Sequence, residues 1–275
     1  MKKLSITLLI AVATCFASLA FAPVSIAQEE DAQEKMQADK TGTNPINFAT
    51  DFRVYNNYTW LNFGDGSANV LTAEYRTPFL DGKWQWRVRA RFTGIEADLN
   101  NDGIDEINET GFGDMDMRFL TILSLNMEQK TAWAAGLEVF LNTASEDTLG
   151  LGTTALGPQL FYVKFLPRGL FAPGLQYKFS IDEDAGRAKT DQILIDLNYL
   201  RMAADKQSWF FTDPQIVIDN ETNTEFAIVD LEWGWMMSKW TELKGHSFYV
   251  RPSIGVGAER LTDYSIEVGY KIVGF

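Results

Sequence analysis

The fold is decided by the stretch WQWRVRARF, which runs from Trp84 to Phe92. Side chains alternate across a β-strand, so both tryptophans, Val88, Ala90 and Phe92 would share one face and the arginines the other. A soluble sandwich would bury the apolar face and leave the arginines in water. A membrane barrel would turn the apolar face to lipid and the arginines into its lumen. One strand is compatible with either fold, so the rest of the chain has to decide.

The same alternation returns along the chain from Phe48 to the C-terminus. Segments of about ten residues alternate apolar and polar side chains and then break at turn residues, a pattern typical of outer-membrane barrels. Besides residues 84–92 and a first strand around 52–63, the clearest segments are 71–79, 114–125, 133–142, 161–165, 171–179, 193–199, 210–218, 227–237, 248–256 and 264–272. We therefore predict an all-β fold, an antiparallel transmembrane β-barrel of about twelve strands.

The connections between these segments separate the barrel from the sandwich. Short ones fall at residues 81–83, 126–131, 167–169, 203–208 and 239–247, and they alternate with longer or more acidic ones at 64–69, 95–109, 143–157, 182–191, 219–223 and 258–263. Outer-membrane barrels have short periplasmic turns and longer outer loops, so both termini are expected in the periplasm. Aromatic residues beside the short turns predict a girdle at that interface; they are Trp84, Trp133, Phe171, Trp209 and Trp240.

The N-terminal residues predict export. Lys2 and Lys3 precede the uncharged apolar run 4–21, and Ser25-Ile26-Ala27 then fits a signal peptidase site. We expect a signal peptide over residues 1–27, a disordered periplasmic tail over the polar residues 28–45, and the barrel over 46–275, in the outer membrane of a Gram-negative cell. A short helical plug inside the barrel is the alternative for the tail.

Composition excludes several classes of function. The net charge of −13 makes the chain a poor partner for nucleic acid. The single cysteine, Cys15, lies in the signal, so no disulfide is expected in the mature chain. The single histidine, His246, is followed by Ser247, but neighbours on a strand point to opposite faces and cannot form a catalytic pair. We predict that the protein is not an enzyme.

Several glycine motifs resemble a known family. They are Gly111-Phe112-Gly113-Asp114, Gly136-Leu137-Glu138-Val139, Leu149-Gly150-Leu151-Gly152 and Leu156-Gly157-Pro158. Together they are similar to the transporter-like outer-membrane group described as the MetA-pathway of phenol degradation, over nearly the whole mature chain. The chain departs from that pattern where the group carries Leu-Pro-Thr-Gly and this sequence has Leu141-Asn142-Thr143-Ala144. The resemblance implies a barrel that passes small organic molecules.

Charged residues on neighbouring strands form a candidate lumen patch. It comprises Glu74, Arg76, Arg87, Arg89, Arg91, Asp114, Asp116 and Arg118. One interpretation is a selectivity patch that attracts anionic groups of a solute. The other is a structural salt-bridge ladder in a narrow barrel, which we favour because the nearby acids are enough to neutralise the arginines.

The acidic loop between Asp98 and Glu109 fits the spacing of a calcium-binding loop. The ligands would be the side chains of Asp98, Asn100, Asp102 and Glu109 and the carbonyl of Ile104. No helices are expected to flank it, so it is not an EF-hand. The alternative is an acidic surface loop with an ordinary Asn-Asp-Gly turn. No other cofactor is expected.

Two functions fit these features. The first is an outer-membrane channel or facilitator for passive passage of small solutes, aromatic or hydrophobic ones included. The second is a structural or adhesive surface barrel with a closed lumen. The expected partners are outer-membrane lipid, a small-molecule solute and the barrel-assembly machinery, with no nucleic acid.

Overall fold

The structure, a computed structural model, describes residues 41–63, 65–100 and 106–275. Almost all of them form antiparallel strands. The strands are β1 (Asp51–Leu61), β2 (Ser67–Phe79), β3 (Trp84–Ala97), β4 (Ile107–Phe112), β5 (Met115–Asn126), β6 (Thr131–Leu141), β7 (Thr153–Leu166), β8 (Gly169–Glu183), β9 (Asp191–Met202), β10 (Ser208–Asp219), β11 (Thr224–Met236), β12 (His246–Val256) and β13 (Thr262–Val273). Two 3₁₀ turns interrupt the connections, η1 (Asp147–Leu149) and η2 (Met237–Lys239). No helix in the described ranges is long and apolar enough to span a membrane.

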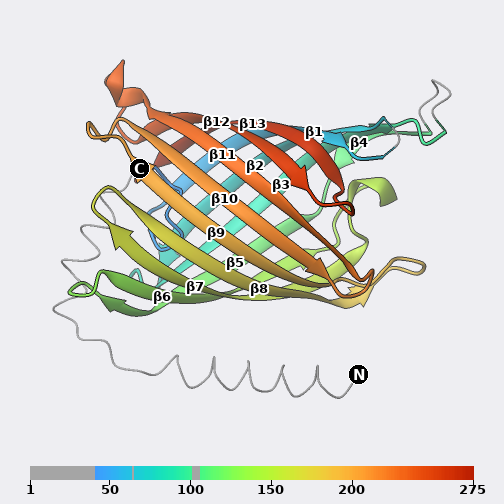
Figure 1. The fold of residues 1–275 in the computed structure, drawn as a ribbon, viewed down its shortest axis with the longest axis horizontal. Coiled ribbons are helices and arrows are strands. Elements are labelled where there is room, and N and C mark those ends of the chain that lie inside the picture. Colours follow the sequence, from blue (N-terminus) through green and yellow to red (C-terminus); the bar gives the residue numbers. More distant parts are fainter. Residues whose placement is uncertain (1–40, 64, 101–105) are drawn as a thin grey trace.

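The strands close into a barrel (Figure 1). Consecutive strands pair with one another except β4 and β5, which both pair with β3, and β1 also pairs with β13, which removes both edges of the sheet. β4 and β5 share one position in the ring, because β4 pairs with the C-terminal half of β3 and β5 pairs with its N-terminal half. The ring therefore has twelve positions, and the predicted antiparallel barrel of about twelve strands is confirmed.

The two ends of the barrel differ. At the short-turn end, the connections are residues 80–83, 127–130, 167–168 and 203–207, together with the longer stretch 237–245 that holds η2. At the long-loop end, the β3–β4 hairpin extends beyond the other strands (Figure 1). The segments 142–152 and 184–190 also lie at that end. The chain enters β1 and leaves β13 at the short-turn end, as predicted for both termini.

Large apolar side chains cover the outer surface of the barrel. Exposed examples come from strands all round the ring: Leu71, Phe92, Trp133, Leu160, Leu175, Ile216, Trp233, Ile254 and Val268. The predicted aromatic girdle is wrong in one member. Trp209 is buried and points inward, where its indole donates to Glu232 Oε1 at 2.7 Å, and its neighbour Phe210 faces outward to contact Trp233. Trp209 and Phe211 both face the inside of the barrel. The position of Trp209 beside a turn gave no indication of this orientation.

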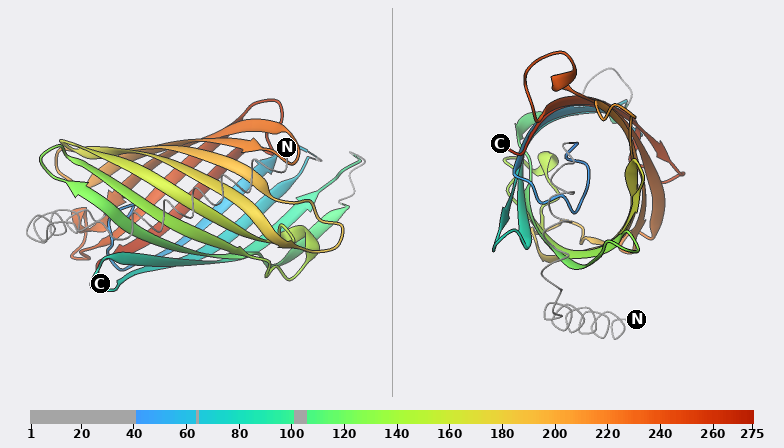
Figure 2. Two further views of the ribbon diagram at one scale, coloured as in Figure 1. Left: turned by 90° about the horizontal axis from the view of Figure 1, so that it is seen from below. Right: turned by 90° about the vertical axis from the view of Figure 1, so that its left-hand side faces the viewer.

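Residues 41–50, called the plug below, lie inside the ring of strands (Figure 2, right). Thr41, Asn44, Ile46 and Asn47 are almost fully buried. The tail was predicted to be disordered up to residue 45, and the structure instead places residues 41–45 within the lumen. Residues 1–40, with the predicted signal peptide and most of the tail, lie outside the described residues.

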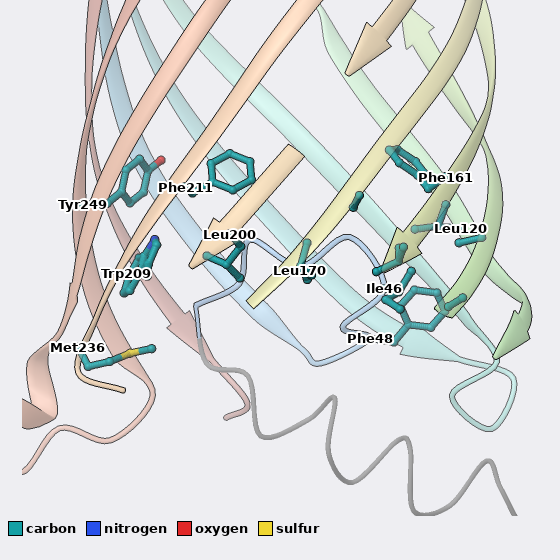
Figure 3. Packing of buried hydrophobic residues seen from close by; sticks show 14 residues of the cluster. Ile46, Phe48, Leu120, Phe161, Leu170, Leu200, Trp209, Phe211, Met236 and Tyr249 are labelled. Carbon is teal, nitrogen blue, oxygen red and sulfur yellow. The ribbon is translucent and has the colours of Figure 1, made fainter. Parts of the chain in front are cut away.

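The plug is held by the inner wall of the short-turn end. Ile46 and Phe48 belong to a buried apolar cluster with inward-facing residues of the strands (Figure 3). These wall residues include Leu120, Ala134, Phe161, Leu170, Leu200, Phe211 and Met236. Polar contacts add to this packing, since Gln85 Nε2 donates to the carbonyl of Asn47 at 3.2 Å. The lumen at the short-turn end is therefore apolar and filled by the plug. The charged part of the lumen lies between this region and the long-loop end.

Candidate functional site

The first group of lumen charges lies on β1 and β2, directly against the plug. Arg53 Nε is 3.3 Å from Asp51 Oδ1 and 3.3 Å from Glu74 Oε1. Arg76 binds both Asp51 and the carbonyl of Gly42, the latter at 2.7 Å, and Arg53 donates to that same carbonyl. Two guanidinium groups thus hold one backbone oxygen of the plug, and Gly42 accommodates this with a positive φ of 67°.

The second group joins β3 to β5 and β6. Asp116 lies at its centre and accepts from Arg89 Nε at 2.9 Å and from Arg91 Nη2 at 2.5 Å. Glu138 accepts from Arg89 Nη2 at 2.9 Å, and Arg87 contacts both carboxylates. Three arginines and two carboxylates therefore form one row of ion pairs, which fixes the arginines in place and leaves one positive charge in excess.

The third group, on β11, β12 and β13, was not proposed from the sequence. Lys271 is fully buried and its Nζ lies 3.1 Å from Glu232 Oε1. Arg251 bridges Glu232 and Glu267, the latter at 3.1 Å, and Tyr249 donates to Glu267 at 2.6 Å. The alternation in the sequence of β11 and β12 placed Glu232 and Arg251 on the inner face. It did not indicate that Lys271 of β13 would form an ion pair with Glu232.

Two residues of the predicted patch behave differently from the rest. Asp114 stands in the break between β4 and β5, where its carboxylate accepts from the backbone N–H groups of Thr143 at 3.0 Å, Ala144 at 3.1 Å and Leu151 at 2.7 Å. It therefore holds the loop at the long-loop end. Arg118 forms no ion pair within the described parts of the chain, although it faces the lumen. The other six residues of the predicted patch fall into two groups: Glu74 and Arg76 belong to the first, and Arg87, Arg89, Arg91 and Asp116 belong to the second.

A row of three acidic residues lines the part of the barrel wall that faces the second charged group. Asp196, Asp213 and Asp230, called the acidic row below, come from the neighbouring strands β9, β10 and β11. Asp213 and Asp230 are direct cross-strand partners, and Asp196 is opposite Gln215. None of the three is in an ion pair with another described residue, in contrast to the carboxylates of the three groups above. The alternation had marked all three as inward-facing, without singling them out.

The charged lumen encloses a cavity of about 400 Å³. Gly42, Thr43 and Pro45 of the plug form part of its lining, so the plug is its floor. The walls are mostly charged and amide side chains from around the ring, among them Arg89, Arg118, Glu138, Gln159, Lys178, Asp196, Asp213, Asp230 and Glu267. Five aromatic rings also reach it: Tyr55, Phe140, Phe161, Phe211 and Tyr249.

The predicted calcium loop is only partly described, since Asp102 and Ile104 lie outside the described residues. Asn100 Nδ2 and the Leu99 N–H both donate to the Glu106 carboxylate at 2.6 Å, whereas the carboxylate of Glu109 on β4 accepts from Thr148 at 2.6 Å. No cluster of three acidic, histidine or cysteine residues suited to a metal occurs in the described ranges. Calcium binding stays a prediction for this loop.

His246 and Ser247 lie on opposite faces of β12. His246 contacts Tyr270, with ring centroids 5.8 Å apart, whereas Ser247 is fully buried inside the barrel. The two side chains therefore do not form the hydrogen-bonded pair that a serine hydrolase needs.

Comparison with known proteins agrees with this architecture. No family model and no curated protein matches the chain. Among solved structures, the fold is similar to the COG4313 outer membrane channel from Pseudomonas putida F1, with a TM-score of 0.65 and 12% identity over 82% of this chain and 95% of that one. It is also similar to the NanC porin, with a TM-score of 0.51 and 12% identity over 82% of this chain and 99% of that one.

The protein is an outer-membrane β-barrel. Its closed twelve-strand ring and apolar outer surface are those of a chain that contacts membrane lipid. The likeness to the COG4313 channel agrees with the fold that the resemblance of the glycine motifs implies, an outer-membrane barrel. Membership of the phenol-degradation group itself stays a prediction.

Proposed function

We propose that the barrel is a passive channel for small solutes and that polar solutes pass through it more readily than hydrophobic ones. The observation that carries this is the cavity of about 400 Å³ at the centre of the barrel, with its mostly charged and amide lining. A hydrophobic solute would displace water from arginines and carboxylates without replacing their hydrogen bonds, which is costly. Five aromatic rings also line the cavity, so a polar solute that itself carries a ring would find aromatic contacts there.

The three charged groups fit a structural role within this proposal. Each of their cations has a carboxylate within ion-pair distance, so most of their charge is compensated within the wall. They would keep the wall of a narrow barrel rigid, which is the ladder interpretation of the predicted patch. Selectivity would then depend on charges that remain unpaired in the cavity.

A non-enzymatic role is part of the proposal. His246 and Ser247 face opposite sides of the barrel wall, which speaks against an outer-membrane hydrolase. Passage of solute needs only a polar path through the lumen. Insertion by the barrel-assembly machinery is expected for this class of barrel and stays a prediction.

The closed-lumen alternative is favoured by the plug. Its apolar contacts and its charge-assisted hydrogen bonds fill the short-turn end. A structural or adhesive barrel would keep this arrangement permanently, whereas a channel must let solute pass the plug.

Conductance separates these two functions. The folded barrel is reconstituted into planar bilayers, and swelling of proteoliposomes in a neutral pentose is measured in parallel. We expect small discrete conductance steps and pentose-dependent swelling. Bilayers and vesicles that contain correctly folded barrel and show neither would contradict the channel and support the closed barrel.

A further inference from the structure

Unpaired charges remain in the cavity on two sides after the three ion-pair groups have formed. The acidic row lies on β9, β10 and β11, and Arg118 lies on β5. Both line the same cavity. Since the barrel has twelve positions and these strands are four to six positions apart, the two sets face one another across the lumen. Lys178 on β8 also lines this cavity without an ion pair in the described ranges, and its Nζ lies 4.1 Å from the ring centroid of Phe140. The wall of β9 to β11 thus carries three unpaired carboxylates, while the unpaired cations Arg118 and Lys178 lie on other strands.

The acidic row carries an unsatisfied acceptor. Asp213 is 8% exposed, and its Oδ1 has no hydrogen-bond partner among the described residues. Its other oxygen accepts from Gln215 Nε2 at 3.0 Å. Asp230 is directly opposite Asp213 on the next strand. Like charges in that position destabilise a sheet, so a cation held between the two carboxylates would relieve their repulsion.

The other side of the cavity offers donors. Arg118 is opposite Glu138 in the register, but the oxygens of Glu138 already accept from Arg87, Arg89 and Gln176. The guanidinium of Arg118 is therefore left for another acceptor. Gln159, on β7, is 5% exposed, and its amide nitrogen has no partner within the described residues. Arg118 and Gln159 are called the donor side below.

We propose that the cavity binds a zwitterionic solute that carries one ammonium group and one carboxylate, as amino acids and short peptides do. The ammonium group lies against Asp213 and Asp230, with Asp196 beside them, and the carboxylate accepts from the donor side. This deepens the proposed channel function by naming its solute class, and it rests on that function only for the passage of the solute, since binding itself can be measured without conduction.

Simpler ligands satisfy only half of this site. A monoanion that pairs with Arg118 leaves the acidic row unrelieved, and a monocation leaves Arg118 unpaired. A divalent metal is disfavoured because no cluster of three acidic, histidine or cysteine residues suited to a metal occurs in the parts of the chain that the structure describes. A ligand with both charges compensates both walls at once.

Binding to the detergent-folded barrel is measured by isothermal titration with unbranched ω-amino carboxylic acids of increasing length. The matched probes are the alkylammonium ion and the alkanoate of the same chain length. We expect at least one amino acid of the series to bind about tenfold or more tightly than both matched probes, the gain of about one ion pair. An alkylammonium ion that binds as tightly as its amino acid, or no binding by any of the series, would overturn the proposal.

Substitutions locate the site. Asp213→Asn together with Asp230→Asn should weaken binding of the amino acid by about tenfold or more and leave that of the alkanoate unchanged. Arg118→Gln should weaken the amino acid and the alkanoate and leave the alkylammonium ion unchanged. Glu225→Gln removes an exposed charge from the same strand as Asp230 and should change none of them. Equal losses in this control would show that overall charge, and not the cavity, governs binding.

Single-channel recording keeps this inference separate from the channel proposal. Block of the ion current by the amino acid at lower concentration than by its matched probes would place the site on the conducting path. Binding without any conductance would retain the site and contradict the channel. Conductance without preferential binding would retain the channel and contradict the site.

Discussion

Val88 and Arg89 are neighbours on β3 whose side chains face two different environments, one outside the barrel and one inside it. Arg89 points inward and is bound to Asp116 and Glu138, whereas Val88 lies in the outer phase between Tyr75 and Met117 of the adjacent strands. Because side chains alternate with a period of two, one step along the strand exchanges lipid for an ion-pair network. Arg89 is stabilised on the inner side because Asp116 and Glu138 already lie there.

Val88→Arg should therefore prevent stable folding. An arginine near the middle of the bilayer costs roughly 2–4 kcal/mol on the outer face of a barrel. The matched control is Leu194→Arg, which places the same side chain in the cavity beside the acidic row. Equilibrium unfolding in guanidinium from lipid vesicles measures both. Equal stability of the two variants would show that the face assignment is wrong.

Glu232 makes a different residue-scale prediction. It is fully buried and accepts from Lys271, Arg251 and Trp209. Glu232→Gln would leave the buried ammonium of Lys271 without its counter-charge, which costs about 3–5 kcal/mol when one partner of a buried pair is removed. The exposed Glu225→Gln should change stability by less than about 0.5 kcal/mol. The difference in guanidinium midpoint between the two variants is the measurement, and similar midpoints would contradict the role given to Glu232.

The limits of sequence reasoning are clear at these residues. Alternation placed Arg87, Arg89, Arg91 and Asp116 on the inner face, because the period of a strand is a local property. It could not say that Glu138 would join them, or that Arg118 would be left out, because long side chains choose among several carboxylates across a tilted sheet. The inward turn of Trp209 was missed for a related reason, since a tryptophan beside a turn suits either face.

The plug is the element with the least sequence signal. Residues 41–50 show no alternation, and their polar composition suits a disordered tail as well as a plug. What holds the plug is tertiary: an apolar wall that receives Ile46 and Phe48 and two guanidiniums that share the Gly42 carbonyl. None of these partners is near it in the sequence.

Ile46→Asp combined with Phe48→Asp should release the plug and increase conductance. Two carboxylates cannot be buried against the apolar cluster without a large desolvation cost, so the segment would leave the wall. Asn44→Asp is the control, because an aspartate can keep the hydrogen bond that Asn44 Oδ1 accepts from Ile46 at 3.1 Å. Single-channel current in planar bilayers measures the effect. An unchanged current in the double variant would mean that the plug does not limit conduction.

The loop 142–152 gives a second prediction at the scale of elements. Asp114 holds it through three backbone N–H groups, and Asp114→Ala would leave those donors without their acceptor. We expect faster cleavage of this loop by protease added to intact cells, while the barrel itself stays folded. Asp147→Ala serves as the control, because it removes an exposed acid from the same loop. Equal cleavage rates in the two variants would contradict the role of Asp114.

At the scale of the whole molecule, the barrel could be predicted although no single strand identified it. Each strand is ambiguous, but alternating short and long connections on a chain with an export signal are explained together only by a closed membrane barrel. The strand β4 was missed, since residues 95–109 were assigned to a connection and the next strand was predicted to begin at Asp114, whereas β3 runs to Ala97 and β4 spans Ile107–Phe112. The size of the cavity was also beyond reach, because it depends on the plug.

Closure of the ring leads to the last prediction. β1 pairs with β13 from Asp51 to Leu61 and with β2 on its other side, so detergent finds no free edge at which to begin unfolding. The unheated protein should migrate faster in a sodium dodecyl sulfate gel than the boiled protein. Val268→Pro removes a backbone N–H within β13, between Asn56 of β1 and Val250 of β12, and should abolish the fast form. Val268→Thr keeps a β-branched side chain and the N–H, and it should retain that form. A wild-type protein that migrates identically before and after boiling would contradict the closed barrel, and a fast form that survives Val268→Pro would show that intact pairing of β13 with its neighbours does not confer the resistance.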